Sequence, residues 1–120
     1  MKIVLNGQPL STQHIYRSVC RGARPVLYMT KEGKAIKEQY QLEVQSQYKG
    51  KVMLVDCAME IILFFKDRRR RDVDNYNKLI LDSLEGIVYE DDKQVQELTV
   101  KKRISVENPR VVIKLTRIKQ

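Results

Sequence analysis

The clearest pattern along the chain is an alternation of apolar and polar positions between Val52 and Phe65. Every odd position from Met53 onward is apolar, whereas the even positions include Asp56 and Glu60. Successive side chains of a strand point to opposite faces, so this period predicts a long strand with one face in the core. The predicted core positions are Met53, Val55, Cys57, Met59, Ile61, Leu63 and Phe65.

Two other segments repeat their apolar residues every three to four positions, which is typical of helices. The first predicted helix follows Thr30, a residue type that caps helices, and runs to about Tyr48. Its predicted buried face comprises Ile36, Tyr40, Val44 and Tyr48. The second helix is expected to start within Asp72–Asn75 and to end at about Glu85, with Gly86 as its C-cap. Its predicted buried face comprises Val73, Tyr76, Ile80 and Leu84.

Shorter apolar runs predict the remaining strands, over residues 2–6, 19–21, 25–29, 95–106 and 110–118. The second and third form a hairpin around Gly22-Ala23, after a loop from Gln8 to Ser18. The element order predicts an α+β fold, a small single domain with two main helices packed on one mixed β-sheet. This domain is expected to span residues 1–120.

Composition narrows the class of protein. Hydrophobic residues make up 42% of the 120-residue chain, which is enough for a compact core. No apolar run approaches the ~18 residues that span a bilayer, and the first residues do not form a signal peptide. We therefore expect a soluble intracellular protein without a membrane partner. Two cysteines and one histidine, His14, are too few for a structural zinc site.

The charge of +8 is unevenly distributed. Residues 1–37 and residues 101–120 each carry seven basic side chains and one acidic side chain, whereas residues 75–100 carry two basic and six acidic ones. Basic ends suit a polyanion partner, but an acidic middle would repel that partner unless it faces away or binds a cation.

The stretch Asp67–Asn75 is the most informative part of the chain. Four arginines, Arg68, Arg69, Arg70 and Arg71, are followed at once by Asp72 and Asp74. In extended backbone the two aspartates point the same way and could share Mg²⁺ with a phosphate oxygen. Lys78 follows Asp74 by four residues, and a second acidic group, Glu90-Asp91-Asp92, follows the helix. Acids within a basic surface favour metal-dependent phosphodiester cleavage.

Each of these features also has a simpler interpretation. Asp72 or Asp74 could cap the second helix, and Lys78 could pair with Asp74 or with Asp82 on the helix surface. The chain would then be a non-catalytic basic nucleic-acid-binding protein, or a small phage assembly factor with only a structural role. Metal-dependent cleavage of DNA separates the enzyme from both alternatives.

The motif Asp67–Asn75, followed by Lys78 and by Asp91-Asp92 before Gln94-Val95, closely resembles the RusA-type Holliday junction resolvases of phages and prophages. Tyr16-Arg17 also resembles that family, whereas Thr12-Gln13-His14 stands where many members have an asparagine. The resemblance implies a homodimeric, Mg²⁺-dependent crossover junction endodeoxyribonuclease of DNA recombination and repair. Mn²⁺ is expected to substitute for Mg²⁺.

The resemblance also implies roles for individual residues. Asp72, Asp74 and Asp92 would be catalytic, metal-binding carboxylates, and Lys78 would be a catalytic lysine. DNA contacts would come from Arg68, Arg69, Arg70, Arg71 and Arg17. The implied substrate is four-way junction DNA, and the implied location is the cytoplasm of a bacterial or phage-infected cell.

Overall fold

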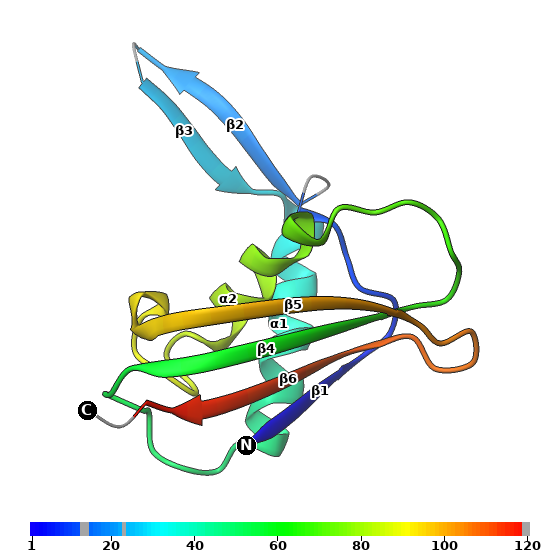
Figure 1. Ribbon diagram of the computed structural model, residues 1–120. Coiled ribbons are helices and arrows are strands. Elements are labelled where there is room, and N and C mark those ends of the chain that lie inside the picture. Colours follow the sequence, from blue (N-terminus) through cyan, green and yellow to red (C-terminus); the bar gives the residue numbers. More distant parts are fainter. Residues whose placement is uncertain (13–14, 23, 119–120) are drawn as a thin grey trace.

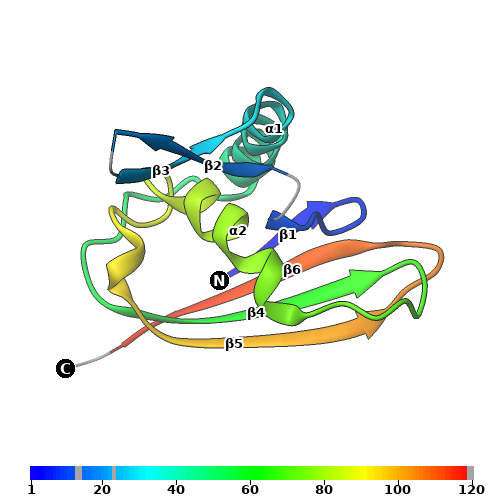
Figure 2. The same ribbon diagram turned by 90° about the horizontal axis from the view of Figure 1, so that it is seen from above.

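A mixed four-stranded sheet carries the core of the molecule in the computed structural model, which describes residues 1–12, 15–22 and 24–118 (Figure 1). Its strand order is β1–β6–β4–β5, comprising β1 (Lys2–Asn6), β4 (Cys57–Phe65), β5 (Val95–Ile104) and β6 (Arg110–Arg117). Strand β4 pairs in parallel with β5 and antiparallel with β6. Helices α1 (Lys31–Gln47) and α2 (Asn77–Leu84) lie on the same side of the sheet (Figure 2). The predicted α+β class is confirmed.

Strand β4 confirms the predicted alternation over only part of its length. Its odd positions from Cys57 to Phe65 are all buried, but residues 52–56 lie outside the strand. Met53 instead forms a bridge with Tyr89, and its backbone N–H donates to the carbonyl of Val88. The prediction that the strand starts at Val52 is therefore wrong. The prediction that Val55 lies in the core is also wrong, because Val55 is 47% exposed. Residues 52–56 lie outside the sheet because Met53 pairs with residues that follow α2.

A hairpin of β2 (Tyr16–Arg21) and β3 (Arg24–Met29) projects from the body of the molecule (Figure 1). The predicted hairpin is confirmed, but β2 begins at Tyr16, within the stretch expected to be a loop. Cross-strand pairing extends back to Tyr16 opposite Met29, which lengthens the ribbon. Gly22 has φ 65° at the turn, a conformation that glycine adopts without steric cost. Gln13 and His14 of the N-terminal loop lie outside the described residues.

The predicted first helix is confirmed together with its cap. Thr30 has extended backbone, and its side chain accepts a hydrogen bond from the N–H of Gly33. Tyr40 and Val44 are buried, while Ile36 and Tyr48 are partly buried against the core. A Cβ at position 33 would lie 2.8 Å from the Ile15 side chain, so only glycine allows this close approach.

The second helix begins as a 3₁₀ turn, η2 (Val73–Tyr76), and continues as α2. Tyr76, Ile80 and Leu84 are buried as predicted, whereas Val73 is only partly buried. Gly86 ends the helix with φ 79°, which confirms its expected role. A second 3₁₀ turn, η3 (Asp92–Gln94), leads into β5. Both final strands end one or two residues before their predicted limits.

None of the described helices combines the length and apolar character needed to cross a membrane.

Candidate active site

One face of α2 carries a line of charged side chains. Lys78, Asp82 and Glu85 follow one another at four and three residues, a spacing that places them on the same side of a helix. The Lys78 Nζ lies 3.4 Å from the Asp82 Oδ2. The expected pairing of Lys78 with Asp82 is confirmed. Lys78 is nearly half exposed, so its ammonium group also faces solvent.

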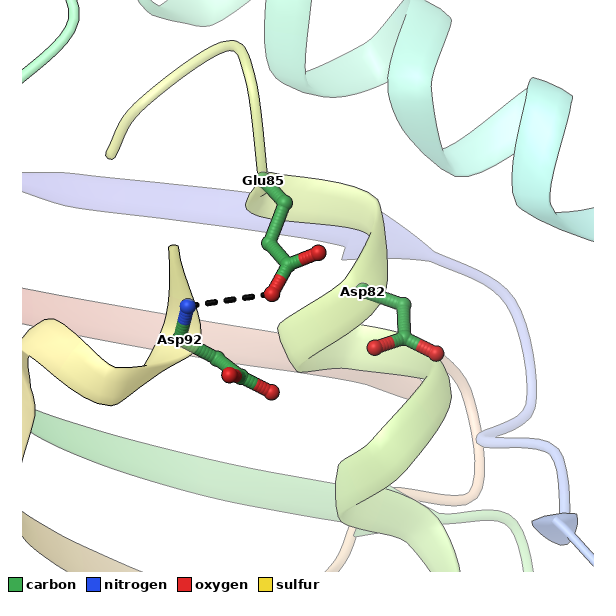
Figure 3. Close-up of side chains that lie close together, drawn as sticks. All are labelled: Asp82, Glu85 and Asp92. Atoms are coloured by element: carbon green, nitrogen blue, oxygen red, sulfur yellow. Dashed lines mark hydrogen bonds between the residues drawn. The ribbon is translucent and has the colours of Figure 1, made fainter. Parts of the chain in front are cut away.

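Three carboxylates meet beside the end of this helix. One carboxylate oxygen from each of Asp82, Glu85 and Asp92 lies within 4.8 Å of the other two (Figure 3). Turn η3 brings Asp92 into place, because its backbone N–H donates a 3.0 Å hydrogen bond to the Glu85 Oε1. Burial raises the pKa of the Glu85 carboxyl above its ordinary value of 4.5, and the charges of Asp92 and Asp82 raise it further. We call these three residues the acidic triad.

Tyr16 connects the hairpin to the acidic triad. Its hydroxyl donates a 2.6 Å hydrogen bond to the Asp82 Oδ2, and the Lys78 ammonium lies 5.1 Å from the centre of its ring. Burial, with the hydrogen bond to Asp82, raises the pKa of the Tyr16 phenol, which therefore stays protonated. The phenol fixes the position of one oxygen of Asp82.

The adjacent aspartates Asp91 and Asp92 have different roles. The Asp91 side chain accepts a hydrogen bond from the N–H of Lys93, and the Gln94 side chain reaches back to the backbone of Asp91. This reciprocal arrangement is a capping box. The hydrogen bond from Lys93 lowers the pKa of Asp91. Only Asp92 of the pair joins the acidic triad.

Asp72 and Asp74 lie at the opposite end of α2 from the triad and are not part of it. Asp74 precedes Asp82 by eight residues, which corresponds to roughly 12 Å along a helix axis. Both aspartates are exposed, and neither side chain has a hydrogen-bond or ion-pair partner among the described residues. Asp72 occupies the N-cap position of η2, and its carbonyl accepts a hydrogen bond from the N–H of Asn75, but its side chain makes no cap hydrogen bond.

The four arginines do not all face solvent. Arg71 points inward, where its guanidinium lies 2.8 Å from the Asp67 carboxylate and 4.4 Å from the centre of the Phe65 ring. The backbone N–H of Arg69 bonds the same carboxylate and is the largest cause of the lowered pKa of Asp67. Arg68, Arg69 and Arg70 are exposed, as is Arg17 on β2. Arg71 therefore holds the loop, while the other four are accessible to a ligand.

The acidic triad fits a hard divalent cation. All its donors are carboxylate oxygens, the ligand type of Mg²⁺ and Mn²⁺. Ligands at ~2.1 Å in octahedral geometry lie ~3 to ~4.2 Å from one another, so a small side-chain adjustment from the present spacing suffices. Without a cation, three carboxylates repel one another, and this repulsion adds to the effect of burial in raising the pKa of Glu85.

Sequence reasoning missed Glu85 and gave Asp82 only the role of partner to Lys78. Their position on one helical face with Lys78 is visible in the sequence and could have indicated a shared site. The contact of Tyr16 could not be found this way, because the two partners are separated by 66 residues.

Comparison with known families shows which family the chain belongs to. The family model described as endodeoxyribonuclease RusA matches residues 6–116, nearly the whole chain. A search of curated proteins finds no match. RusA enzymes are hydrolytic nucleases, which excludes the interpretations as a non-catalytic binding protein or an assembly factor. The chain therefore belongs to the RusA family of Holliday junction resolving endodeoxyribonucleases.

Proposed function

We propose that this chain cleaves four-way DNA junctions by paired, Mg²⁺-dependent nicks, with Mn²⁺ as a substitute ion, in the cytoplasm of a bacterial or phage-infected cell. The observation that carries the proposal is the acidic triad next to Lys78, in a chain whose family cleaves DNA. A cluster of acids costs binding to a polyanion unless a cation reverses its sign.

We assign catalytic roles to Asp72, Asp74, Lys78 and Asp92, the residues indicated by the family motif. Asp92 is supported by its place in the acidic triad, and Asp72 and Asp74 by their free, exposed carboxylates. Asp82 and Glu85 join Asp92 in binding the cation. Arg68, Arg69, Arg70 and Arg17 contact the DNA backbone, and Arg71 acts indirectly by holding their loop.

Each protein group has a simple chemical task in this site. A bound divalent cation polarises a phosphoryl oxygen and lowers the pKa of an attacking water. The Lys78 ammonium, paired on one side with Asp82, stabilises negative charge on the scissile phosphate or on the leaving oxygen. Tyr16 holds Asp82 in position, and the exposed arginines align the strand through its phosphates.

A homodimer would supply the second active site that paired nicks require. One chain carries a single acidic triad among its described residues, and a two-fold dimer would match the symmetry of the junction. Light scattering at assay concentration should give about twice the 14.1 kDa mass. A stable monomer that still makes coordinated nicks would contradict this part of the proposal.

The proposal is tested by cleavage of a labelled four-way junction with Mg²⁺ and with chelator. Asp72→Asn, Asp74→Asn, Asp92→Asn and Lys78→Ala should each lower cleavage by orders of magnitude. In chelator, the Asn variants should bind the junction as well as wild type or more tightly, because a charge that repels phosphate is gone. Glu90→Gln is the matched control, since Glu90 is exposed and outside the triad.

The same series separates the two acidic groups. Loss of cleavage in Asp72→Asn and Asp74→Asn, with Mg²⁺ binding retained, would place these aspartates at the phosphate and the cation at the triad. Full cleavage by both variants would show that Asp72 and Asp74 are not part of the active site. Cleavage by wild type in chelator would contradict the metal-dependent mechanism.

A further inference from the structure

A groove lies between the edge strand β5 and the loop of residues 67–71, which we call the arginine loop. It has a volume of about 290 Å³, and its walls include Arg68 and Arg69 on one side and Lys102 and Arg103 on the other. Phe65 and Ile104 supply its apolar part. Two segments more than thirty residues apart in sequence thus bring basic side chains to one concave surface.

The charge in this groove is not neutralised within the protein. Asp67 is the one carboxylate in its lining; Arg71 binds it at 2.8 Å, and Arg69, 84% exposed, lies 3.9 Å from it. Neither Lys102 nor Arg103 forms an ion pair with a described residue, whereas the neighbouring Lys101 lies 3.1 Å from Glu60. Like charges held together repel one another, so this surface favours an anionic ligand.

Lys102 is held in place for such a role. Its Nζ donates a 2.6 Å hydrogen bond to the carbonyl of Arg71, which fixes the ammonium between the loop and the strand. An ammonium group has three donors, so two remain for a ligand. This bond also links the position of the arginine loop to β5.

We propose that this groove binds a backbone phosphate of the junction DNA, with Lys102 and Arg103 as contacts in addition to Arg68 and Arg69. The inference rests on the proposed function and names a second place where the enzyme holds its substrate. Guanidinium and ammonium groups are the common protein partners of DNA phosphates. Seven residues of β5 separate Val95, next to the acidic triad, from Lys102, which is ~23 Å of strand. The groove therefore lies away from the acidic triad, beside the segment that carries Asp72, and holds the DNA at a second place.

An alternative explanation of the basic residues is protection of an edge strand, because lysines there prevent pairing with other chains. That explanation requires no contact with DNA. It expects aggregation of the substituted protein and no change in its affinity for the junction.

The test measures junction affinity in chelator over a range of salt concentrations. The double variant Lys102→Gln/Arg103→Gln is compared with Lys101→Gln/Lys114→Gln, which removes the same charge from lysines that both lie within 4.0 Å of Glu60. The groove variant should bind more weakly, and its slope of log K against log salt should flatten by about 0.9 per lost contact. The control pair should behave as wild type.

Three further measurements make the result specific. The Lys102→Arg variant keeps the positive charge and should therefore retain its affinity for the junction. Thermal unfolding reports whether each variant is folded. Because phosphates carry no sequence information, the loss should be equal on two junctions of different sequence. Unchanged affinity and slope in the folded groove variant, equal losses in the control pair, or a sequence-dependent loss would each overturn the proposal.

The results that would contradict the groove proposal differ from those that would contradict the proposed function. If wild type cuts the junction with Mg²⁺ but the groove variant binds it normally, only the proposal that the groove binds a phosphate is contradicted. Wild type that does not cut contradicts the proposed function itself, whatever the groove variant does.

Discussion

The hydroxyl of Tyr16 donates a 2.6 Å hydrogen bond to the Oδ2 of Asp82, which ties the projecting hairpin to the acidic triad. The Asp82 carboxylate is only 17% exposed, so its remaining freedom is small. Through this contact the hairpin influences the position of a carboxylate of the acidic triad.

Tyr16→Phe should lower the cleavage rate more than the affinity for the junction. The substitution keeps the ring under Lys78 but removes a hydrogen bond to a charged group, which costs about 1.5–3 kcal/mol when both partners are buried and less here. Single-turnover cleavage and binding in chelator give the two values. Tyr28→Phe on β3 is the control, because Tyr28 is 44% exposed and its hydroxyl makes no hydrogen bond with a described residue. Equal behaviour of the two variants would argue against the positioning role.

Mg²⁺ should raise the melting temperature of wild type, because a ligand that binds only the folded state stabilises it. At ten times the dissociation constant the gain is about 1.4 kcal/mol, or roughly 6 °C for a domain of this size. Glu85→Gln should melt higher than wild type in chelator, since one of three repelling charges is removed, and should lose most of the Mg²⁺ response. Glu90→Gln should keep the full response. An undiminished response in Glu85→Gln would exclude Glu85 as a ligand.

Replacing Arg69 and Arg70 by Ala should flatten the salt dependence of junction binding. Each neutralised phosphate contributes about 0.9 to the slope of log K against log salt. Both residues are exposed, so their loss should not affect folding. In the control variant, Lys49 and Lys51, two exposed lysines after α1, are replaced by Ala. An identical change of slope in both double variants would show that net charge alone is responsible.

Asp67→Asn should destabilise the protein at neutral pH but not in strong acid. The hydrogen bond from the backbone N–H of Arg69, with the side-chain hydrogen bond and charge of Arg71, lowers the pKa of Asp67 below its ordinary value of 3.8. A lowered pKa stabilises the folded state above the ordinary value, and this stabilisation is lost as the pH falls through the lowered pKa. Urea unfolding of both proteins between pH 7 and pH 2 gives the difference, which should shrink toward zero below pH 3.8. A constant difference would assign the effect to shape and not to charge.

Much of the fold follows from local pattern. The alternation from Cys57 to Phe65, the cap at Thr30 and the stop at Gly86 depend on neighbouring residues in the chain, and all three are confirmed. Val55 was wrongly placed in the core because its alternation matches that of β4, while its surroundings are set by pairing of the same segment with residues after α2. A local pattern cannot report such a competing partner.

For the site, the sequence by itself determined the chemistry: an arginine run lies beside paired aspartates, and a lysine follows one helical turn later. This motif also indicated the family, which the family comparison confirms. Only the tertiary structure decided which groups meet. The connection from α2 to β5 carries Asp92 back against Glu85, the hairpin delivers Tyr16 to Asp82, and Arg71 turns inward onto Phe65. These contacts depend on the directions in which separate elements pack, and side-chain chemistry at one position does not encode those directions.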